Sequence, residues 1–453
     1  MAVWSVIKTR SLASGFRLDP EYYQPRYLKD SALIDKLTSN AIGAMSVVTD
    51  GIHGSPDEVD EGGVRYLSAK CVKDNEFVLG DALQISDAQH AANPRTALRA
   101  EDVLITTVGT IGNTAVVQED ILPANSDRHL GIIRLNKNAQ VDPYYLATFL
   151  NSEYGRFQSL REATGSVQLN LFIEKIRELR IPILDCADQV SRDTRRAYER
   201  RRDAVKSMAQ AEALLVSSLG LEHIDVSSSR SYSRPFRDLL SGHRFGAEYF
   251  MPCKQRALNA LAKLPYRSLS SHASSIRDMW DPVEARKDEV VRNFDLGHAL
   301  EPFLDDTTEP TDAREIGSAK KSFKAGDVVI SRLRSYLREI AVVRTSGAVA
   351  CVGSSEFIVL RPTGSGISAE TMLVYLRCPL VQTILKWSQD GSNHPRFDEN
   401  DLLAIPVPDR LLVVQSRIDR CVHDAISARQ EATRLLDEAK AKVEKAMLSG
   451  MDS

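Results

Sequence analysis

The run Ser331–Arg338 reads SRLRSYLR and is the local stretch whose residue types most suggest binding chemistry. If it is a strand, alternate side chains share one face. Three guanidinium groups and a phenol on one face could hold phosphates, and arginine can contact guanine O6 and N7 together. A solvated strand face with intramolecular ion pairs fits the same pattern. The residues on that face would be Arg332, Arg334, Tyr336 and Arg338.

Two loops that each follow a Gly-Ser pair carry amide, imidazole or guanidinium side chains. Asparagine and glutamine can pair bidentately with adenine N6 and N7. Polar residues are also common in solvated loops, so each of these residues taken singly fits an ordinary surface position. The candidates after Gly165-Ser166 are Gln168 and Asn170, and those after Gly391-Ser392 are Asn393, His394 and Arg396.

Two turns in the first half of the chain offer further donors. The run Thr106–Asn113 contains two glycines and carries hydroxyls and an amide, and it equally fits a simple hairpin turn. The run Asp50–Pro56 is a turn with one histidine, which equally fits a solvated loop position. The candidate DNA-contacting residues of this half, besides the two amides above, are His53, Lys70, Thr110 and Asn113.

Motifs for catalysis are missing from the sequence. A methyltransferase would need a glycine-rich cofactor loop and an Asn/Asp-Pro-Pro-aromatic motif, but the chain has no Pro-Pro dipeptide and no GxxxxGK[ST] phosphate loop. A nuclease would need clustered carboxylates with a nearby lysine, and Glu438-x-Lys440 falls in a predicted helix. The six cysteines are scattered, without the spacing of a zinc site. We predict a binding protein without cofactor or metal, whose cysteines are reduced.

The chain contains an internal repeat at an offset of 224 to 227 residues. Matching segments occur in the same order in both copies, which predicts a duplicated unit and not a chance similarity. The matched pairs are Arg17–Pro25 with Arg244–Pro252, Asp102–Ile105 with Asp327–Ile330, Ala115–Val117 with Ala341–Val343, Gly165-Ser166 with Gly391-Ser392, and Ile181–Ile183 with Ile405–Val407.

Each copy is followed by a segment that reads as one long helix. Residues 185–220 contain no proline and no glycine before Gly220, which stands where a left-handed C-cap belongs. Both segments carry small and apolar residues at four-three spacing, a narrow seam typical of a coiled coil. The seams are Val190, Thr194, Ala197, Ala204, Met208, Ala211, Leu215 and Ser218 in the first, and Val414, Ile418, Cys421, Ala425, Ala428, Ala432, Leu435, Ala439 and Ala446 in the second.

The length of 453 residues and the composition are those of a globular protein of several domains. A formal net charge of −3 gives no global basic field, so a nucleic-acid surface would have to be a local patch. The N-terminal residues lack the apolar core of a signal peptide, and no run approaches the length of a membrane helix. We expect a cytoplasmic protein.

Within each copy, short helices and a strand-rich middle predict an α+β fold. Helices are expected over residues 28–37, 144–160, 256–264 and 369–387, with strands over runs such as DVLITTVG and DVVISRL between them. The expected boundaries are a first globular domain at 1–184, a long helix at 185–220, a linker at 221–234, a second globular domain at 235–409 and a second long helix at 410–448.

Two copies of an α+β unit, each followed by a long helix, resemble the specificity (S) subunit of type I restriction-modification systems. The resemblance covers nearly the whole chain and rests on order and duplication more than on any one motif. Its segments are DGIHGSP, DVLITTVGTIGNTAVV with its echo DVVISRLRSYLREIAVV, the pair GSVQLNL and GSNHPRF, and the exits IPIL and IPVP into the helices.

The resemblance implies that each globular domain is a target recognition domain for half of a split, asymmetric DNA sequence. The two helices would pair antiparallel as a ruler, and methyltransferase (M) subunits would dock on them, with S-adenosylmethionine bound in those partners. The helix residues that could meet a partner are Arg195, Arg196, Arg200 and Arg201. Nuclease or translocase subunits, in a restriction or antiphage defence complex, would be separate chains.

The sequence therefore favours a non-catalytic DNA-recognition subunit that directs a partner adenine methyltransferase. A scaffold whose two domains bind proteins and not DNA stays open as the alternative. At 1.5 Å per residue, the stretch from Asp188 to Ser218 would span about 46 Å, comparable to roughly 14 base pairs.

Overall fold

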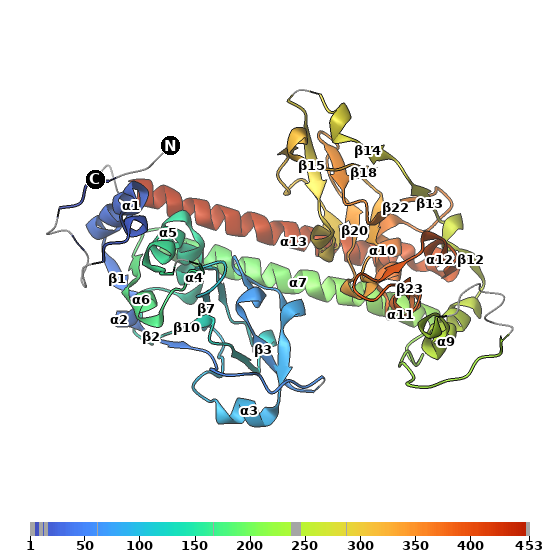
Figure 1. Ribbon diagram of the computed structural model, residues 1–453, viewed down its shortest axis with the longest axis horizontal. Coiled ribbons are helices and arrows are strands. Elements are labelled where there is room, and N and C mark those ends of the chain that lie inside the picture. Colours follow the sequence, from blue (N-terminus) through green and yellow to red (C-terminus); the bar gives the residue numbers. More distant parts are fainter. Residues whose placement is uncertain are drawn as a thin grey trace. The chain divides into compact units, whose positions relative to one another are not determined.

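The computed structural model describes residues 5–8, 12, 17–60, 62–165, 167–236, 246–286 and 288–449. The chain divides into two compact units, 1–201 with 430–453 (unit 1) and 202–429 (unit 2) (Figure 1). Each long helix therefore contributes one segment to each unit. Ser166, Arg244 and Phe245, which belong to the predicted repeat, lie outside the described residues.

Unit 1 is built on a four-stranded antiparallel sheet in the order β2-β10-β7-β8. Its central strand β7 is buried along its whole length, because one apolar core lies on each face of the sheet. These strands are β2 (Ser46–Asp50), β10 (Leu130–Leu135), β7 (Val103–Thr106) and β8 (Thr114–Val116).

Smaller sheets and short helices complete unit 1. Strand β3 pairs in parallel with β9 and antiparallel with β6, and β1 pairs with β11. The strands are β1 (Ser39–Ala41), β3 (Val64–Leu67), β4 (Val72–Lys73), β5 (Glu76–Phe77), β6 (Leu83–Ile85), β9 (Ala124–Ser126) and β11 (Arg180–Pro182). The helices are α1 (Pro25–Lys36), α2 (Ile42–Met45), α3 (Asp87–Ala92), α4 (Pro143–Asn151), α5 (Glu153–Glu162) and α6 (Ile173–Glu178).

Unit 2 repeats this plan with a five-stranded sheet in the order β13-β22-β19-β20-β16. The first four positions match those of the unit 1 sheet, including the antiparallel hairpin in its centre. These strands are β13 (Ala273–Ile276), β22 (Phe357–Pro362), β19 (Val328–Ser331), β20 (Ile340–Val343) and β16 (Phe303–Leu304).

A second five-stranded sheet of unit 2 has the order β14-β18-β21-β15-β17, and two strand pairs, β12-β25 and β23-β24, stand apart from it. Its strands are β14 (Met279–Trp280), β18 (Lys320–Phe323), β21 (Ala350–Gly353), β15 (Val290–Phe294) and β17 (Thr311–Asp312). The pairs are formed by β12 (Tyr266–Ser268), β25 (Pro406–Pro408), β23 (Gln389–Asp390) and β24 (Arg396–Phe397). The short helices are α9 (Pro252–Ala262), α10 (Ala369–Arg377), α11 (Pro379–Lys386) and α12 (Glu399–Leu403).

An ion pair between a buried aspartate and a partly exposed arginine, here called the clamp, stands at the same place in both central sheets and confirms the duplication. In unit 1, the Arg134 guanidinium donates to both Asp102 oxygens at 2.8 and 2.6 Å. In unit 2, Arg361 donates to both Asp327 oxygens at 2.7 and 2.8 Å. Each aspartate also accepts a backbone N–H three residues upstream at 2.8 Å, so its burial is compensated on both oxygens.

The two long helices are α7 (Ala187–Leu219) and α13 (Arg410–Ser449), as predicted. Gly220 has φ +66°, the left-handed conformation expected at the end of α7. Within unit 1, Ala197 packs with Ala432 and its neighbours in one apolar cluster. In unit 2, seam residues of both helices share the main core.

The direction of the pairing follows from polar contacts inside unit 1. Lys442 binds Asp193 at 2.5 Å, near the start of α7. Glu431, earlier in α13, binds Arg200, which lies later in α7, at 2.8 Å. The helices are therefore antiparallel, as the predicted coiled coil requires.

Two helix predictions are wrong in one respect, because each predicted helix is two. Residues 144–160 divide into α4 and α5 at Ser152, whose extended backbone (ψ 166°) ends the first helix. Residues 369–387 divide into α10 and α11 at Cys378, because Pro379 disfavours a helical residue before it. All six cysteines are free thiols, as predicted.

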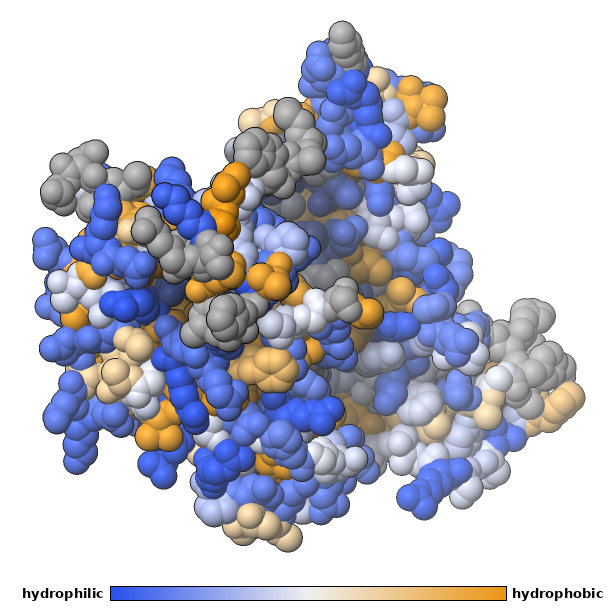
Figure 2. Space-filling view, turned by 60° about the vertical axis from the view of Figure 1, so that its left-hand side comes forward, coloured by the Kyte–Doolittle hydropathy of each residue, from blue (hydrophilic) through white to orange (hydrophobic). Residues whose placement is uncertain are grey.

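A helix that spans a membrane must be both long and apolar, and Figure 2 shows the hydropathy of one face. No described helix is both long and apolar enough to span a bilayer. On the face drawn in Figure 2, hydrophilic side chains predominate and hydrophobic ones form small scattered groups.

We expect Asp327, the buried aspartate that binds Arg361 in the clamp, to be a main stabilising residue of unit 2. Replacing Asp327 with alanine leaves the Arg361 guanidinium without its partner and should cost about 3 kcal/mol of the free energy of unfolding. Urea unfolding of the full chain, followed by circular dichroism, measures this. The control is Asp312→Ala, which removes the partner of the exposed Arg314 and should cost much less. Equal losses in the two variants would contradict a special role for the clamp.

Candidate nucleic-acid interface

Three segments of unit 1 meet beyond the end of strand β7. The Thr107 amide donates to the His129 carbonyl at 3.0 Å, and the Leu171 amide donates to the Thr107 carbonyl at 2.9 Å. Val108 and Asn170 form an isolated antiparallel bridge. The loop after β7, the turn before β10 and the loop that follows Gly165 are therefore joined by main-chain hydrogen bonds.

These segments and the turn at Asp50 and His53 line a half-open cavity of about 380 Å³. Its lining contains both apolar and polar side chains, a composition suited to flat polar groups such as base edges. The apolar residues are Val108, Leu169, Leu171, Phe172 and Ile173, and the polar residues are Asp50, His53, Thr107, Arg128, His129, Gln168 and Asn170. The structure thus brings together three of the predicted residues, His53, Gln168 and Asn170.

Carboxylates hold the two histidines of the cavity. His53 Nε2 and Asp50 Oδ2 share a hydrogen bond at 2.5 Å, and His129 Nδ1 lies 3.0 Å from Asp127 Oδ2. Asp50 also accepts from Arg95 at 3.3 Å. Burial raises the pKa of the Asp50 carboxyl, but the hydrogen bonds from His53, its own backbone and Arg95 outweigh this and lower the pKa below its usual value.

The other predicted residues of unit 1 do not line the cavity. Thr110 is exposed in the hairpin between β7 and β8, and Lys70 is exposed on a short 3-10 turn, Ala69–Cys71. Asn113 is buried, because its amide donates to the Val72 carbonyl at 3.4 Å and accepts from Arg156. Its hydrogen bonds serve the fold of the hairpin, which confirms the interpretation of this run as a turn.

The predicted strand over Ser331–Arg338 is wrong. Strand β19 ends at Ser331, and a 3-10 turn, Ser335–Leu337, follows. Arg334 and Arg338 flank it with φ +49° and +54°, left-handed conformations that break the alternation of side chains. The alternation of arginines with other residues predicted a strand, but the same alternation occurs here in a turn with two left-handed residues.

The arginines of this turn nevertheless gather with the loop that follows Gly391. The Arg334 amide donates to the Pro395 carbonyl at 2.9 Å, and Leu333 forms a bridge with Arg396. The Arg334 guanidinium reaches the Asn393 carbonyl at 3.4 Å and His394 Nδ1 at 3.2 Å. Tyr336 and Arg338 are exposed on the same turn.

Glu356 connects two of these arginines. It accepts from Arg332 at 2.8 Å and from Arg396 through two nitrogens, at 2.8 and 3.0 Å. The hydrogen bond from Arg396 is the main reason that the pKa of Glu356 falls to about 2, with Arg332 adding to it against the opposing effect of burial. The carboxylate therefore stays charged and fixes both guanidinium groups.

The main-chain bonds that join the three segments of the unit 2 site match those of unit 1. The bridge of Leu333 with Arg396 matches that of Val108 with Asn170. The Phe397 amide donates to the Arg332 carbonyl at 3.2 Å, and the Arg332 amide donates to the Glu356 carbonyl at 3.1 Å. Leu171, Thr107 and His129 make the same two bonds in unit 1.

Sequence reasoning missed His129, Arg128, Arg95 and Glu356. Glu356 and His129 precede equivalent strands, β22 and β10, at the offset of the repeat. Extending the repeat to this turn would have placed both residues beside the loops. Arg95 has no such signal, because it lies far in sequence from the Asp50 that it contacts.

The four helix arginines proposed for partner contacts are engaged inside unit 1. Arg195 binds Glu101 and Asp142 at 3.1 and 3.0 Å. Arg196 and Arg200 both bind Glu431 of α13. Arg201 donates to the Asn75 carbonyl and lies 3.4 Å from Glu76. These contacts hold α7 against its neighbours, and docking of a partner on them stays a prediction.

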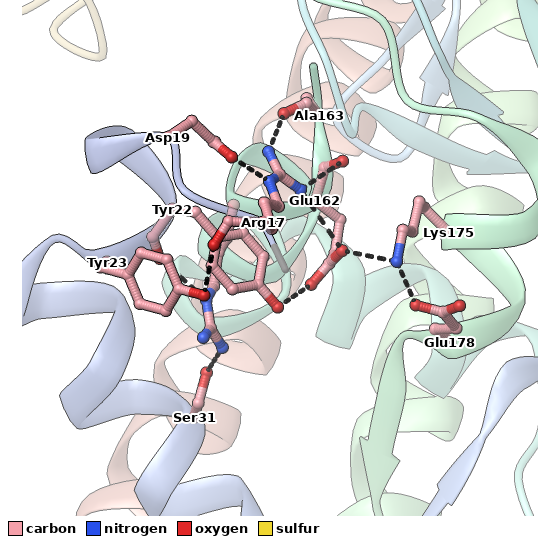
Figure 3. A network of polar contacts seen from close by, with 10 residues as sticks. Arg17, Asp19, Tyr22, Tyr23, Ser31, Glu162, Ala163, Lys175 and Glu178 are labelled. Atoms are coloured by element: carbon pink, nitrogen blue, oxygen red, sulfur yellow. Dashed lines mark hydrogen bonds and ion pairs between the residues drawn. The ribbon is translucent and has the colours of Figure 1, made fainter. Parts of the chain in front are cut away.

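A polar network holds the base of the loop that carries Gln168 and Asn170 (Figure 3). Glu162, at the end of α5, accepts from the Tyr22 hydroxyl at 3.0 Å and lies 3.4 Å from Lys175 of α6. Arg17 donates to the Ala163 carbonyl at 2.9 Å. Glu162 thus joins the two helices between which the loop runs, and the segment with Arg17 and Tyr22 covers the junction.

Comparisons with known proteins yield solved structures only. No protein-family model and no curated protein matches the chain. A crystal structure of a type I restriction-modification S subunit from M. genitalium is similar over 90% of this chain and 94% of its own, at 12% identity and a TM-score of 0.41.

Two further structures have TM-scores of 0.29. One describes complex assembly and conformational transition of the type I restriction-modification system, at 16% identity. The other is the HsdS subunit from Thermoanaerobacter tengcongensis, at 15% identity. Both cover 91% of this chain and 96% of their own.

We expect Glu162 to limit the motion of the loop. In Glu162→Gln the ionic contacts with Arg17 and Lys175 are lost, so the amides of Thr164 and Asn170, which bond each other's carbonyls at 2.9 and 2.7 Å, should exchange faster with deuterium. Hydrogen exchange with mass spectrometry measures this. Glu178→Gln, which removes the exposed partner of Lys175, is the control. Unchanged exchange in Glu162→Gln would show that the loop is held by its main chain alone.

The depressed pKa of Glu356 predicts an acid-sensitive contribution to stability. Because the folded-state pKa is about 2 and the ordinary value 4.5, the contribution is complete above about pH 4.5 and is lost as the pH falls toward 2. The difference in melting temperature between the wild type and Glu356→Gln should be equal at pH 7 and 5 and smaller at pH 3. Glu309→Gln, at an exposed position, serves as control. A difference that persists undiminished at pH 3 would contradict the ion-pair account.

Proposed function

We propose that the chain is a non-catalytic subunit that recognises a split, asymmetric sequence in double-stranded DNA. One observation carries this proposal: the same three-segment site occurs twice, on two copies of one sheet, with different side chains in each copy. Two sites that share one backbone arrangement but carry different side chains are suited to two different DNA half-sites. Their side chains are amides, imidazoles and guanidinium groups, and amides and guanidinium groups are among the side chains that hydrogen-bond base edges and phosphates.

Under this proposal, residues 1–184 and 235–409 are the two target recognition domains, and 221–234 is a linker. Residues 185–220 and 410–448 are the spacer helices, whose length would set the gap between the half-sites. In the first domain His53, Gln168 and Asn170 would contact bases, Lys70 and Thr110 would lie at the margin, and Asn113 would support the hairpin. In the second domain the contacts would come from Arg332, Arg334, Tyr336, Arg338, Asn393, His394 and Arg396.

The sequence resemblance supplies the rest of the proposal. A methyltransferase (M) partner would bind the cofactor and modify adenine, so this chain itself would need no cofactor. Arg195, Arg196, Arg200 and Arg201 are the proposed docking residues, and a nuclease or translocase could join the complex. The proposed location of the chain is the cytoplasm.

Selection from a random duplex library tests this function. The purified full chain, alone and with a co-purified methyltransferase, should enrich duplexes that share two short conserved blocks separated by unconserved base pairs. The affinity of enriched duplexes should fall steeply with salt, because binding releases counterions from neutralised phosphates. Absence of binding in both preparations would favour the protein scaffold, and a single contiguous block would contradict the use of two equivalent sites.

A further inference from the structure

The two sites differ in charge, in free donors and in apolar surface, and these differences bear on which bases each could recognise. The argument rests on the proposed DNA-recognition function and goes beyond it to the chemistry of each half-site.

In unit 1 the donors and acceptors free to bind are neutral amides. The side chains of Gln168 and Asn170 make no hydrogen bond or ion pair with any described residue. Between and beside them, Val167 is fully exposed and Leu169 is 42% exposed. An amide is the side chain that pairs bidentately with adenine, and an apolar side chain is what contacts the thymine methyl group. The loop thus carries both halves of A·T recognition.

Two aspartates and two arginines balance the charge near this loop. Asp50 accepts from Arg95 and is bonded to His53, and Asp127, which precedes Arg128 in the chain, is bonded to His129. Such a surface attracts phosphates weakly. Recognition by unit 1 must then rest mainly on base edges and methyl groups.

In unit 2 the described residues of the site include four arginines and two carboxylates, those of Glu356 and Glu339. Glu339 is buried, and burial raises the pKa of its carboxyl. Glu356 accepts hydrogen bonds from both Arg332 and Arg396, and the Arg396 guanidinium reaches both of its carboxylate oxygens. Arg334 is different, because its guanidinium hydrogen-bonds a carbonyl and an imidazole, at 3.4 and 3.2 Å, and its interaction with the Glu339 carboxylate is electrostatic only. Its donors are not committed to a carboxylate.

The main chain holds Arg334 in place. Its amide is bonded to the Pro395 carbonyl, and its left-handed conformation is fixed by the turn that follows. A guanidinium on a fixed backbone loses less freedom on binding, and its two parallel donors match guanine O6 and N7. Arg338 is also left-handed, and its amide is bonded to the Ser335 carbonyl at 2.9 Å. Its side chain is exposed and makes no hydrogen bond or ion pair with a described residue, which suits contact with a phosphate.

We infer that the two units recognise half-sites of different base chemistry. The amide and apolar loop of unit 1 binds A·T pairs in its half-site. Unit 2 binds guanine through Arg334 and phosphate through Arg338.

The test compares the sequences selected from a random duplex library by the full-length wild type and by two single variants. Arg334→Ala should lower the preference for guanine at one position of one block by about tenfold and leave the other block unchanged. Arg338→Ala is the matched control from the same turn. It should weaken binding to all duplexes alike and reduce the salt slope by about one. Both side chains lie at the surface of the turn, so equal melting temperatures verify folding.

A third variant and two modified bases examine the other half-site. The double variant Gln168→Ala with Asn170→Ala should relax the preference for A·T pairs in the block that Arg334→Ala leaves intact. Replacing guanine with 7-deazaguanine, which lacks the N7 acceptor, should weaken wild-type binding only in the Arg334 block. 7-Deazaadenine should weaken it only in the other block.

The outcomes separate this inference from the proposed function. No split sequence with the wild type would reject the proposed function and the inference together. A split sequence whose guanine preference is untouched by Arg334→Ala, or is altered equally by Arg338→Ala, would leave DNA recognition standing and overturn the assignment. A loss of guanine preference in the double variant Gln168→Ala with Asn170→Ala would also overturn the assignment and leave DNA recognition standing.

Discussion

The buried aspartate–arginine clamp is the interaction on which each unit depends. Asp102 and Asp327 stand directly before the central strands β7 and β19, and both are almost completely buried. Their partners, Arg134 and Arg361, lie on the neighbouring strands β10 and β22. The clamp fixes the register of the two strands at one end of the sheet. The loops that form the candidate interface leave the same strands at the other end, so their positions follow from the clamp.

Two copies of this framework can carry different chemistry, because the loops are joined by main-chain bonds. The bridges between Val108 and Asn170, and between Leu333 and Arg396, involve no side chain. Side chains at these positions can therefore differ without loss of the backbone arrangement. The result is an amide and apolar surface in unit 1 and an arginine surface in unit 2, which is the property that an asymmetric target demands.

Much of the architecture was predictable, because its signals are local or repeated. The seams of α7 and α13 show in the spacing of small residues, and the sheet strands show in their apolar runs. The turn at Arg334 was not predictable, since arginine does not favour the left-handed conformation that Arg334 and Arg338 adopt, and the Pro395 carbonyl that binds the Arg334 amide is distant in sequence. Glu356 was missed because its partners Arg332 and Arg396 lie 24 and 40 residues away. The grouping of Gln168, Asn170 and His53 needed the fold.

Sequencing of methylated bases tests the central claim most directly, that two repeated sites recognise two halves of one target. A host that carries the full chain with a partner adenine methyltransferase supplies the DNA. The account predicts methylation at a split motif, with two unlike blocks separated by a constant gap. Methylation within one contiguous block, or methylation that is unchanged when this chain is deleted, would contradict it.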